Sequence, residues 1–385
     1  MNIADLTPTS LLTSLEQLAC AATEDACASA LVSAAGLVQE AVLGGQSGDS
    51  FHGALSTCPQ DLGMQMTAVL DRAVNFHLLA SGGTLGLWLL PVVVNAGKAL
   101  PSTIPLEART MNGLKMSGCL LEQLGLSTAM AGGKRAGWTY ILPALYSDEQ
   151  IRNIDLGELI RLPHQARDVV RGARKAVSFD AGADRAGAAG VSLYYLPFVA
   201  FAPEGLPPTM PMGSAKTTTR MTQWATDTLQ PMLADGFSVH VGHVPQPFSL
   251  ALRVGQRLRT DVHLRELMQR VSAESGVAPN GLAALVAPYA TKQTDGTFMV
   301  GVSLVSRLTK NVVATLSLPA ESEGGEDEVA QVTHILKDMG MDCIQDFHAP
   351  ITTIACQHCG NLQYALPNAQ VAFDSMAKPS AENLH

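Results

Sequence analysis

Aromatic and charged residues are scarce in this sequence, and positive charge is not in excess. Aromatic residues make up 5% and charged residues 15% of the 385 residues, whereas 47% are hydrophobic. A chain of this length, for which two or three domains are expected, can therefore bury a large core built mainly from aliphatic side chains. The formal net charge of −9 disfavours a general nucleic-acid-binding protein, because such proteins usually carry a basic excess.

The sequence also lacks the short motifs that mark common catalytic sites. It contains no nucleophile elbow, no HExxH and no paired-carboxylate motif. These absences make an enzyme less favoured. An enzyme stays an alternative, because catalytic residues can be scattered along a chain.

Signals for export and for membrane insertion are missing as well. The N-terminus carries Asp5 and has no basic region followed by an apolar stretch, so we expect no signal peptide. Seven scattered cysteines, an odd number, indicate reduced thiols and a cytoplasmic protein. The stretches 76–97 and 186–203 approach spanning length, but proline or glycine interrupts both, which favours buried strands over membrane segments.

The most informative feature present is an internal duplication. Residues 87–106 match residues 193–212 without a gap, and nine of the twenty positions are identical. Chance would give about one or two identities at ordinary composition. Shorter matches flank this one in the same order, 72–76 with 175–179 and 154–159 with 262–267. Two similar structural units are therefore predicted.

Apolar runs separated by turn signals predict that each unit is a helix–strand–helix–strand–helix repeat. The strands are expected at 86–95 and 138–146 in the first copy, and at 191–202 and 236–245 in the second. We expect an α/β fold of two tandem αβαβα repeats with a helical N-terminal segment and a C-terminal α+β module. The expected divisions are an N-terminal helical segment (1–61), repeat one (62–163), repeat two (164–275), the α+β module (276–376) and a disordered tail (377–385).

The C-terminal module follows a different pattern from the repeats. Strands are predicted over 282–290, 298–306 and 312–318, with a hairpin signal at Asp295-Gly296. An amphipathic helix is predicted over 328–339, and a short strand over 351–355.

One segment of this module has the spacing of a metal-binding knuckle. Cys356 and Cys359 are separated by two residues and followed by Gly360, a pattern in which two thiolates chelate one zinc ion. Cys343 and His348 are the nearest candidates for the two remaining ligands. A pair of plain reduced thiols and a redox dithiol are the alternatives that the sequence leaves open.

The same segment resembles a known family. The pattern Cys356-x-x-Cys359-Gly360-x-Leu362-x-Tyr364-x-x-Pro367-Asn368, after a sheet module containing Val286-Ala-Pro288, is similar to the C-terminal end of a β-proteobacterial family of unknown function. The resemblance covers about a quarter of the chain. It implies a cytoplasmic bacterial protein and no particular chemistry.

Two further groups of residues are candidates for binding. Arg167, Arg171 and Arg174 lie at helical spacing and form a positive stripe that could contact nucleic acid, although a solvated helix face is the alternative. His240 and His243 lie three apart on a predicted strand, so they face opposite sides and do not share one metal ion; His240 lies on the polar face.

The sequence favours a binding or assembly protein, a scaffold or regulator that contacts a protein partner or a second copy of itself. A hydrolase or transferase with its site between the two repeats is the first alternative. A nucleic-acid-associated protein of a bacterial genome or mobile element is the second.

Overall fold

The computed structural model describes most of the chain as two compact units. The described residues are 8–44, 62–80, 82–107, 137–179, 190–202, 215–233, 238–242, 246–290, 298–309, 311–320, 325–355 and 362–365. Unit 1 comprises residues 1–256 and unit 2 comprises residues 257–385. Both combine helices with β-sheet, so the expected mixed α/β class is confirmed.

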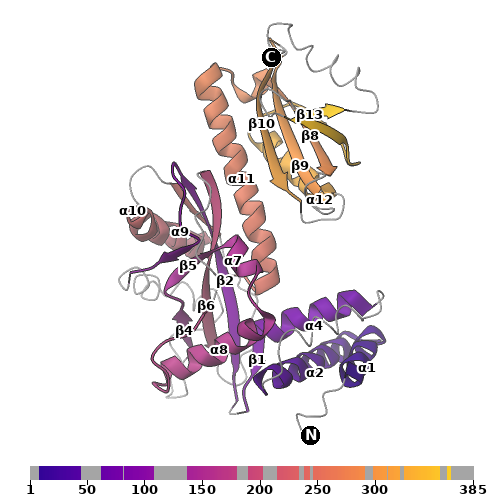
Figure 1. Ribbon diagram of the computed structural model, residues 1–385, viewed down its shortest axis with the longest axis vertical. Helices are drawn as coiled ribbons and strands as arrows, with labels where there is room; N and C mark the ends of the chain where they lie inside the picture. The colour runs from indigo at the N-terminus through magenta and orange to yellow at the C-terminus, as the bar shows by residue number, and fades with distance from the viewer. Residues whose placement is uncertain are drawn as a thin grey trace. The chain divides into compact units, whose positions relative to one another are not determined.

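Unit 1 contains one sheet, whose strands differ in length, with helices around it (Figure 1). The strands are β1 (Phe76–Leu78), β2 (Thr84–Ala96), β3 (Thr103–Pro105), β4 (Trp138–Ile141), β5 (Ala144–Ser147), β6 (Gly190–Ala202) and β7 (Ser238–Val241). The helices are α1 (Pro8–Ala19), α2 (Glu24–Leu43), α4 (Gly63–Asn75), α7 (Asp148–Arg152), α8 (Leu156–Val170), α9 (Ala215–Trp224), α10 (Gln230–Met232) and the first part of α11 (Phe248–Ser275), with a π-helical turn η3 (Ala225–Leu229) between α9 and α10.

The two long strands β2 and β6 form the centre of this sheet. They pair antiparallel along their entire length, and Leu90 lies directly opposite Leu196. The first half of the twenty-residue sequence match covers most of both strands. The prediction that 86–95 and 191–202 are buried neighbouring strands is therefore confirmed. Apolar side chains on both faces of a strand are typical of a sheet that is covered on both sides.

Prolines inside both central strands are tolerated because the neighbouring strand is interrupted beside each of them. Pro197 faces the break between β4 and β5, where its carbonyl oxygen accepts a hydrogen bond of 3.0 Å from the Leu142 amide. Pro91 faces the residues after β7, where its carbonyl accepts one of 2.8 Å from the Gly242 amide. A proline lacks the amide hydrogen that a continuous neighbouring strand would require.

Helices cover both faces of the β2–β6 pair. Even-numbered side chains of both strands, including Trp88, Leu90 and Phe198, pack with α9, η3 and α10. Odd-numbered side chains are also buried, and α4 and α8 contact β2 on that side (Figure 1). Each fully buried leucine or phenylalanine contributes about 1.5–3 kcal/mol relative to an exposed one, so this layer supplies much of the stability.

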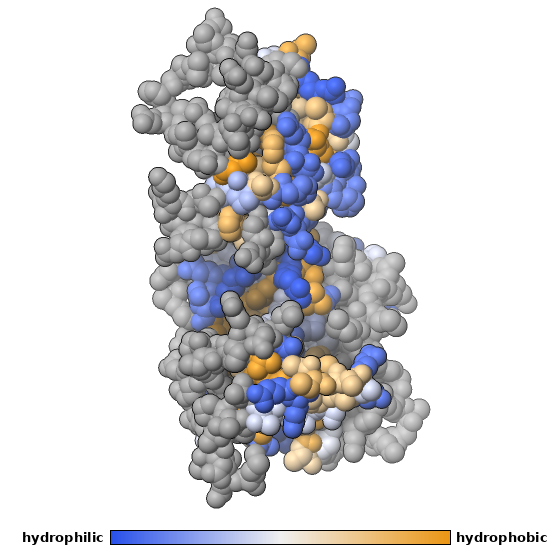
Figure 2. Space-filling model, turned by 90° about the vertical axis from the view of Figure 1, so that its right-hand side faces the viewer, coloured by the Kyte–Doolittle hydropathy of each residue, from blue (hydrophilic) through white to orange (hydrophobic). Residues whose placement is uncertain are grey.

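The N-terminal helices α1 and α2 pack on α4, and α2 also contacts α8. On this side of unit 1, in the lower part of Figure 2, hydrophobic and hydrophilic surfaces lie intermixed. In the described part of the chain, α2 is the one helix with the length and composition to cross a membrane, and 28% of its most apolar window is buried. One such helix is weak evidence of membrane location, because core helices of soluble proteins and signal sequences near an N-terminus meet the same criteria of length and composition.

The start of α11 is held by side chains of α4. The Asn75 side-chain oxygen accepts a hydrogen bond of 2.7 Å from the Phe248 amide, and an Asp71 carboxylate oxygen accepts one of 2.5 Å from the Ser249 hydroxyl and one of 3.3 Å from the Ser249 amide. A carboxylate at this place satisfies amides that no helical carbonyl reaches and interacts favourably with the helix dipole.

Unit 2 begins within α11 and contains a four-stranded sheet. Strands β8 (Leu282–Ala290), β9 (Phe298–Ser306), β10 (Val312–Pro319) and β11 (Cys343–Asp346) lie in the order β10-β9-β8-β11, with β11 parallel to β8. The helix α12 (Glu326–Asp338) and the α11 residues Leu264, Leu267, Met268 and Val271 pack on one face of this sheet. A short 3-10 turn η4 (Pro279–Gly281) precedes β8, and β12 (Thr352–Ala355) pairs with β13 (Leu362–Ala365).

The expected meander of three strands and one helix is confirmed in unit 2, whereas β11 was not among the expected strands. Among the expected divisions, the one between 163 and 164 falls inside α8, and the division between the compact units falls inside α11 rather than after it. Residues 171–179, near the start of the expected second repeat, are not helical. Residues 203–212 of the duplicated segment and the expected tail 377–385 lie outside the described residues.

A close approach between Gly255 of α11 and Tyr195 of β6 gives a first prediction. A Cβ atom at Gly255 would lie 2.5 Å from the Tyr195 hydroxyl oxygen, and that hydroxyl is itself held against Asp148 and the Leu252 carbonyl. Gly255→Ala should therefore destabilise the protein by about 1–3 kcal/mol through overpacking. The measurement is the urea midpoint of unit 1, followed by tryptophan fluorescence.

Gly97→Ala is the matched control, because a Cβ there meets nothing within 4 Å. Its effect should stay within about 0.5 kcal/mol. Equal midpoints for the two variants would contradict the packing of α11 on β6.

Candidate functional site

A pocket of about 220 Å³ lies in unit 1 between α2, α4, β1 and α8. Its walls combine apolar side chains with four polar ones, Gln39, Glu40, Arg72 and His164. The apolar part is formed by Val32, Ala35, Gly36, Leu43, Phe76 and Leu78. Apolar walls with a few converging polar groups are the usual character of a small-molecule site.

Exposed apolar side chains gather at this pocket. Leu43 is 45% exposed and Leu78 is 62% exposed, and they are two of the five large hydrophobic side chains that are exposed among the described residues. Both line the pocket. Leaving leucine side chains in water costs free energy that a ligand covering them would recover.

Arg72 supplies positive charge to the pocket without a carboxylate partner. No ion pair joins Arg72 to an acidic residue in the part of the chain that the structure describes. Its guanidinium carbon lies 4.6 Å from the centre of the Phe76 ring, and Phe76 in turn packs edge-on against Trp88 of the central strand. Burial lowers the pKa of Arg72 below its ordinary value, but a guanidinium stays protonated in proteins.

One wall of the pocket is formed by His164, which contacts the buried His77 behind it. His164 of α8 and His77 of β1 are joined by a contact of 3.2 Å between His164 Nε2 and His77 Nδ1, and His77 Nε2 lies 3.2 Å from the Val74 carbonyl oxygen. A carbonyl oxygen only accepts hydrogen bonds, so His77 carries its proton on Nε2 and its Nδ1 is the acceptor. His164 then donates through Nε2, and its own Nδ1 remains an acceptor.

Both histidines are held in their neutral form. Burial, with a smaller contribution from the neighbouring His164, lowers the pKa of His77 to about 3. Burial also lowers the pKa of His164, with a smaller contribution from Arg167 in the same direction. Neutral rings keep the direction of the hydrogen-bond chain fixed at neutral pH.

Gln39 is fixed by the end of α4. Its side-chain nitrogen donates hydrogen bonds of 2.7 Å to the Ala73 carbonyl and 2.8 Å to the Phe76 carbonyl. Both amide hydrogens are thereby used, and the side-chain oxygen remains as an acceptor.

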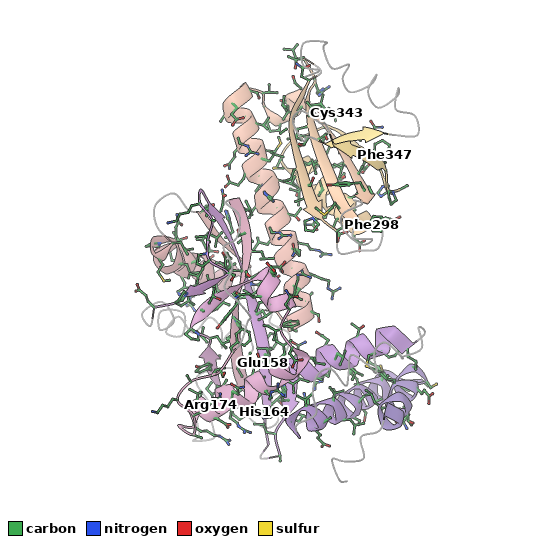
Figure 3. All side chains as sticks on the ribbon, viewed as in Figure 1. Glu158, His164, Arg174, Phe298, Cys343 and Phe347 are labelled. Carbon is green, nitrogen blue, oxygen red and sulfur yellow. The ribbon has the colours of Figure 1, made fainter. Side chains whose placement is uncertain are left out.

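Two of the four predicted zinc ligands, Cys343 and His348, lie in the described part of the chain. Cys343 and His348 are both exposed, and Cys356 and Cys359 lie outside the described residues. No group of three or more histidine, cysteine or acidic side chains that could hold a metal ion occurs among the residues described. Figure 3 locates Cys343 and Phe298 toward opposite ends of the unit 2 sheet.

The arginines of the predicted stripe lie in and just after the last turn of α8. Arg167 lies inside the helix and pairs with Asp168, and Arg171 is the residue that ends the helix. Arg174 lies beyond it (Figure 3). Nucleic-acid contact through Arg167, Arg171 and Arg174 stays a prediction. His240 is exposed on β7, as its place on the polar face predicts, and His243 lies outside the described residues.

Sequence reasoning did not single out any polar residue of the pocket. Gln39 and Glu40 belong to an alanine-rich helix, and Arg72 lies 92 positions before His164 in the chain. The one available signal was His77, a histidine within an otherwise apolar stretch.

The buried histidine pair predicts a loss of stability in mild acid. The unfolded chain binds a proton at His77 near the ordinary pKa of 6.5, whereas the folded protein does so only near 3. Stability is therefore complete above about pH 6.5 and falls as the pH decreases toward 3, by up to about 1.4 kcal/mol per pH unit for this group. His77→Gln should flatten this dependence, because glutamine does not bind a proton in this pH range. Its side chain can still donate to Val74 and accept from His164. Urea unfolding at several pH values between 7 and 4 measures the slope.

His240→Asn, at an exposed position of β7, is the control for the histidine experiment and should keep the wild-type slope. Identical slopes for His77→Gln and the wild type would show that His77 does not stay neutral in the folded protein.

The zinc site remains a prediction with a direct test. Elemental analysis should find about one zinc per chain, and the double substitution Cys356→Ser, Cys359→Ser should remove it. Substituting the exposed Cys20 and Cys27 of the N-terminal helices should leave the zinc content unchanged. Metal-free wild-type protein whose melting curve does not respond to chelator would mean that these cysteines are plain thiols.

Comparison of the chain with models of protein families, with curated proteins and with solved structures finds no match. The geometry and charge of the pocket are therefore the basis for assigning a function.

Proposed function

We propose that this chain is a bacterial cytoplasmic binding protein, built on an internal duplication, whose unit 1 holds a small molecule in the pocket beside His164. The observation that carries the proposal is Arg72, a charged and partly buried side chain that lines the pocket and has no ion pair among the described residues. A charge in such a place gains most from a ligand that supplies the missing partner.

Strand register supports the duplication. The sequence match pairs Leu90 with Leu196, and these two residues face each other where β2 crosses β6. An antiparallel pair has a local two-fold axis at such a point, so each strand can be rotated onto the other.

The neighbouring strands follow the same two-fold relation. β7 of the second copy pairs with β2 of the first, and β4 of the first pairs with β6 of the second. Val92 lies opposite Val241, as Phe198 lies opposite Ile141. Exchanged strands of this kind are what two fused copies of one subunit would give.

Other features fit binding better than the two alternatives. Apolar side chains occupy the junction of β2 and β6, where the first alternative would put an enzyme site between the repeats. Arg167 of the proposed nucleic-acid stripe is already paired with Asp168. The free thiols Cys20, Cys27 and Cys343 suit a reducing cytoplasm.

The pocket can be closed by one substitution. Gly36 of α2 lines it, and a Cβ there would meet nothing within 4 Å, so Gly36→Phe should fill the space without a clash at the backbone. Ser33→Phe, at an exposed position of the same helix, is the matched control.

Binding can be followed through the His164 ring. L-leucine, 4-methylpentanoate, 3-methylbutylamine and phosphate would be titrated while the ring Cε1–H signals are recorded by NMR, assigned with His164→Gln. At least one compound should shift the His164 signal in the wild type and in Ser33→Phe, and none should do so in Gly36→Phe. A His164 signal that no compound moves, or one that still moves in Gly36→Phe, would refute the proposed site.

A further inference from the structure

The polar groups of the pocket are one cation and several acceptors. Arg72 can only donate hydrogen bonds. Glu40 is an acceptor, Gln39 keeps only its side-chain oxygen because both amide hydrogens are bound at the end of α4, and His164 keeps Nδ1 as an acceptor because its Nε2 donates to His77. A ligand that satisfies this set needs a negative group for Arg72 and a strong donor for the others.

We propose that the pocket binds a free α-amino acid with an apolar side chain, with its carboxylate on Arg72 and its ammonium group facing Glu40, Gln39 and His164. This assignment rests on the proposed function, since it names the ligand of the same site. A planar guanidinium matches the two oxygens of a carboxylate, and an ammonium group offers three donors to the acceptors.

The apolar walls and the size of the pocket fit this ligand class. Val32, Leu43 and Leu78 offer a surface for a hydrocarbon side chain, and the two leucines are exposed when nothing covers them. The volume of about 220 Å³ is below the range of about 300–1,000 Å³ that is usual for sites of drug-sized molecules. A metabolite of a few heavy atoms is therefore favoured.

Singly charged ligands satisfy only half of the pocket. A carboxylate without an ammonium group, or a phosphate, would leave Gln39 and His164 without a donor and would bring a negative charge toward Glu40. An amine without a carboxylate would leave Arg72 unpaired. Unsatisfied polar groups in a partly buried site reduce affinity strongly.

The test uses isothermal titration of the full chain with four related compounds. L-leucine carries both charges, L-leucinamide lacks the carboxylate, 4-methylpentanoate lacks the ammonium group, and 3-methylbutylamine lacks the carboxylate and the amide. L-leucine should bind at least about tenfold more tightly than each of the others, because charged hydrogen bonds are lost in every case. L-leucinamide also represents the N-terminus of a peptide. Its affinity therefore distinguishes a site for a free amino acid from a site for the N-terminus of a peptide.

Substitutions then assign the two ends of the ligand. Arg72→Gln and Glu40→Gln should each weaken L-leucine binding by about tenfold or more. Ser33→Phe should bind L-leucine as the wild type does. Gly36→Phe, which keeps all the charges, should abolish binding.

The outcomes separate this inference from the proposed function. If 4-methylpentanoate or 3-methylbutylamine binds as tightly as L-leucine and Gly36→Phe abolishes that binding, the amino-acid assignment is wrong and the binding function stands. If L-leucine affinity does not change in Glu40→Gln, the ammonium position is wrong. If none of these compounds binds, the amino-acid assignment is wrong, and if phosphate does not shift the His164 signal either, both proposals fail.

Discussion

Unit 1 depends on the antiparallel pairing of β2 with β6. These strands are the longest in the sheet, and nearly all their side chains are buried on both faces. The pairing joins segments about a hundred residues apart, so its loop-closure entropy is compensated only because a long ladder and two covered faces form together. Every other strand of this sheet reaches the pair directly or through β5. The helices α4 and α8 contact β2, and α9, η3 and α10 pack with the even-numbered side chains of the pair.

The pocket is anchored to this pair through aromatic and polar contacts. Trp88 of β2 packs against Phe76, and Phe76 lies under the guanidinium of Arg72. His77 follows Phe76 in β1 and holds His164 of α8 in one tautomer. A rigid sheet thus positions one cation and one oriented imidazole, whereas α2 contributes Gln39 and Glu40 from the other side. Fixed donors and acceptors of this kind favour ligand affinity, because little ordering is required on binding.

Sequence patterns predicted where helices and strands lie better than which elements they pair or pack with. The strands of unit 2 at 282–290 and 298–306 agree with β8 and β9 residue for residue, since hairpin signals and continuous apolar runs are local properties. The segment 343–346 was not predicted as a strand because it is short and polar, and only its parallel pairing with β8 makes it one. The expected boundary at 163–164 falls inside α8 for a similar reason: a helix continues as long as its buried face has a partner, whatever the period of the duplication.

The sequence by itself determined the mixed α/β class, the buried central strands and the matching of Leu90 with Leu196, because apolar runs, prolines and a repeated segment are properties of the chain alone. Only the tertiary structure decided that the matched strands pair face to face, and that each inner proline lies beside a break in the next strand. The same holds for the pocket. Gln39, Arg72 and His164 are ordinary residues of three helices, and they acquire a common role because packing buries them around one space and orients their hydrogen bonds.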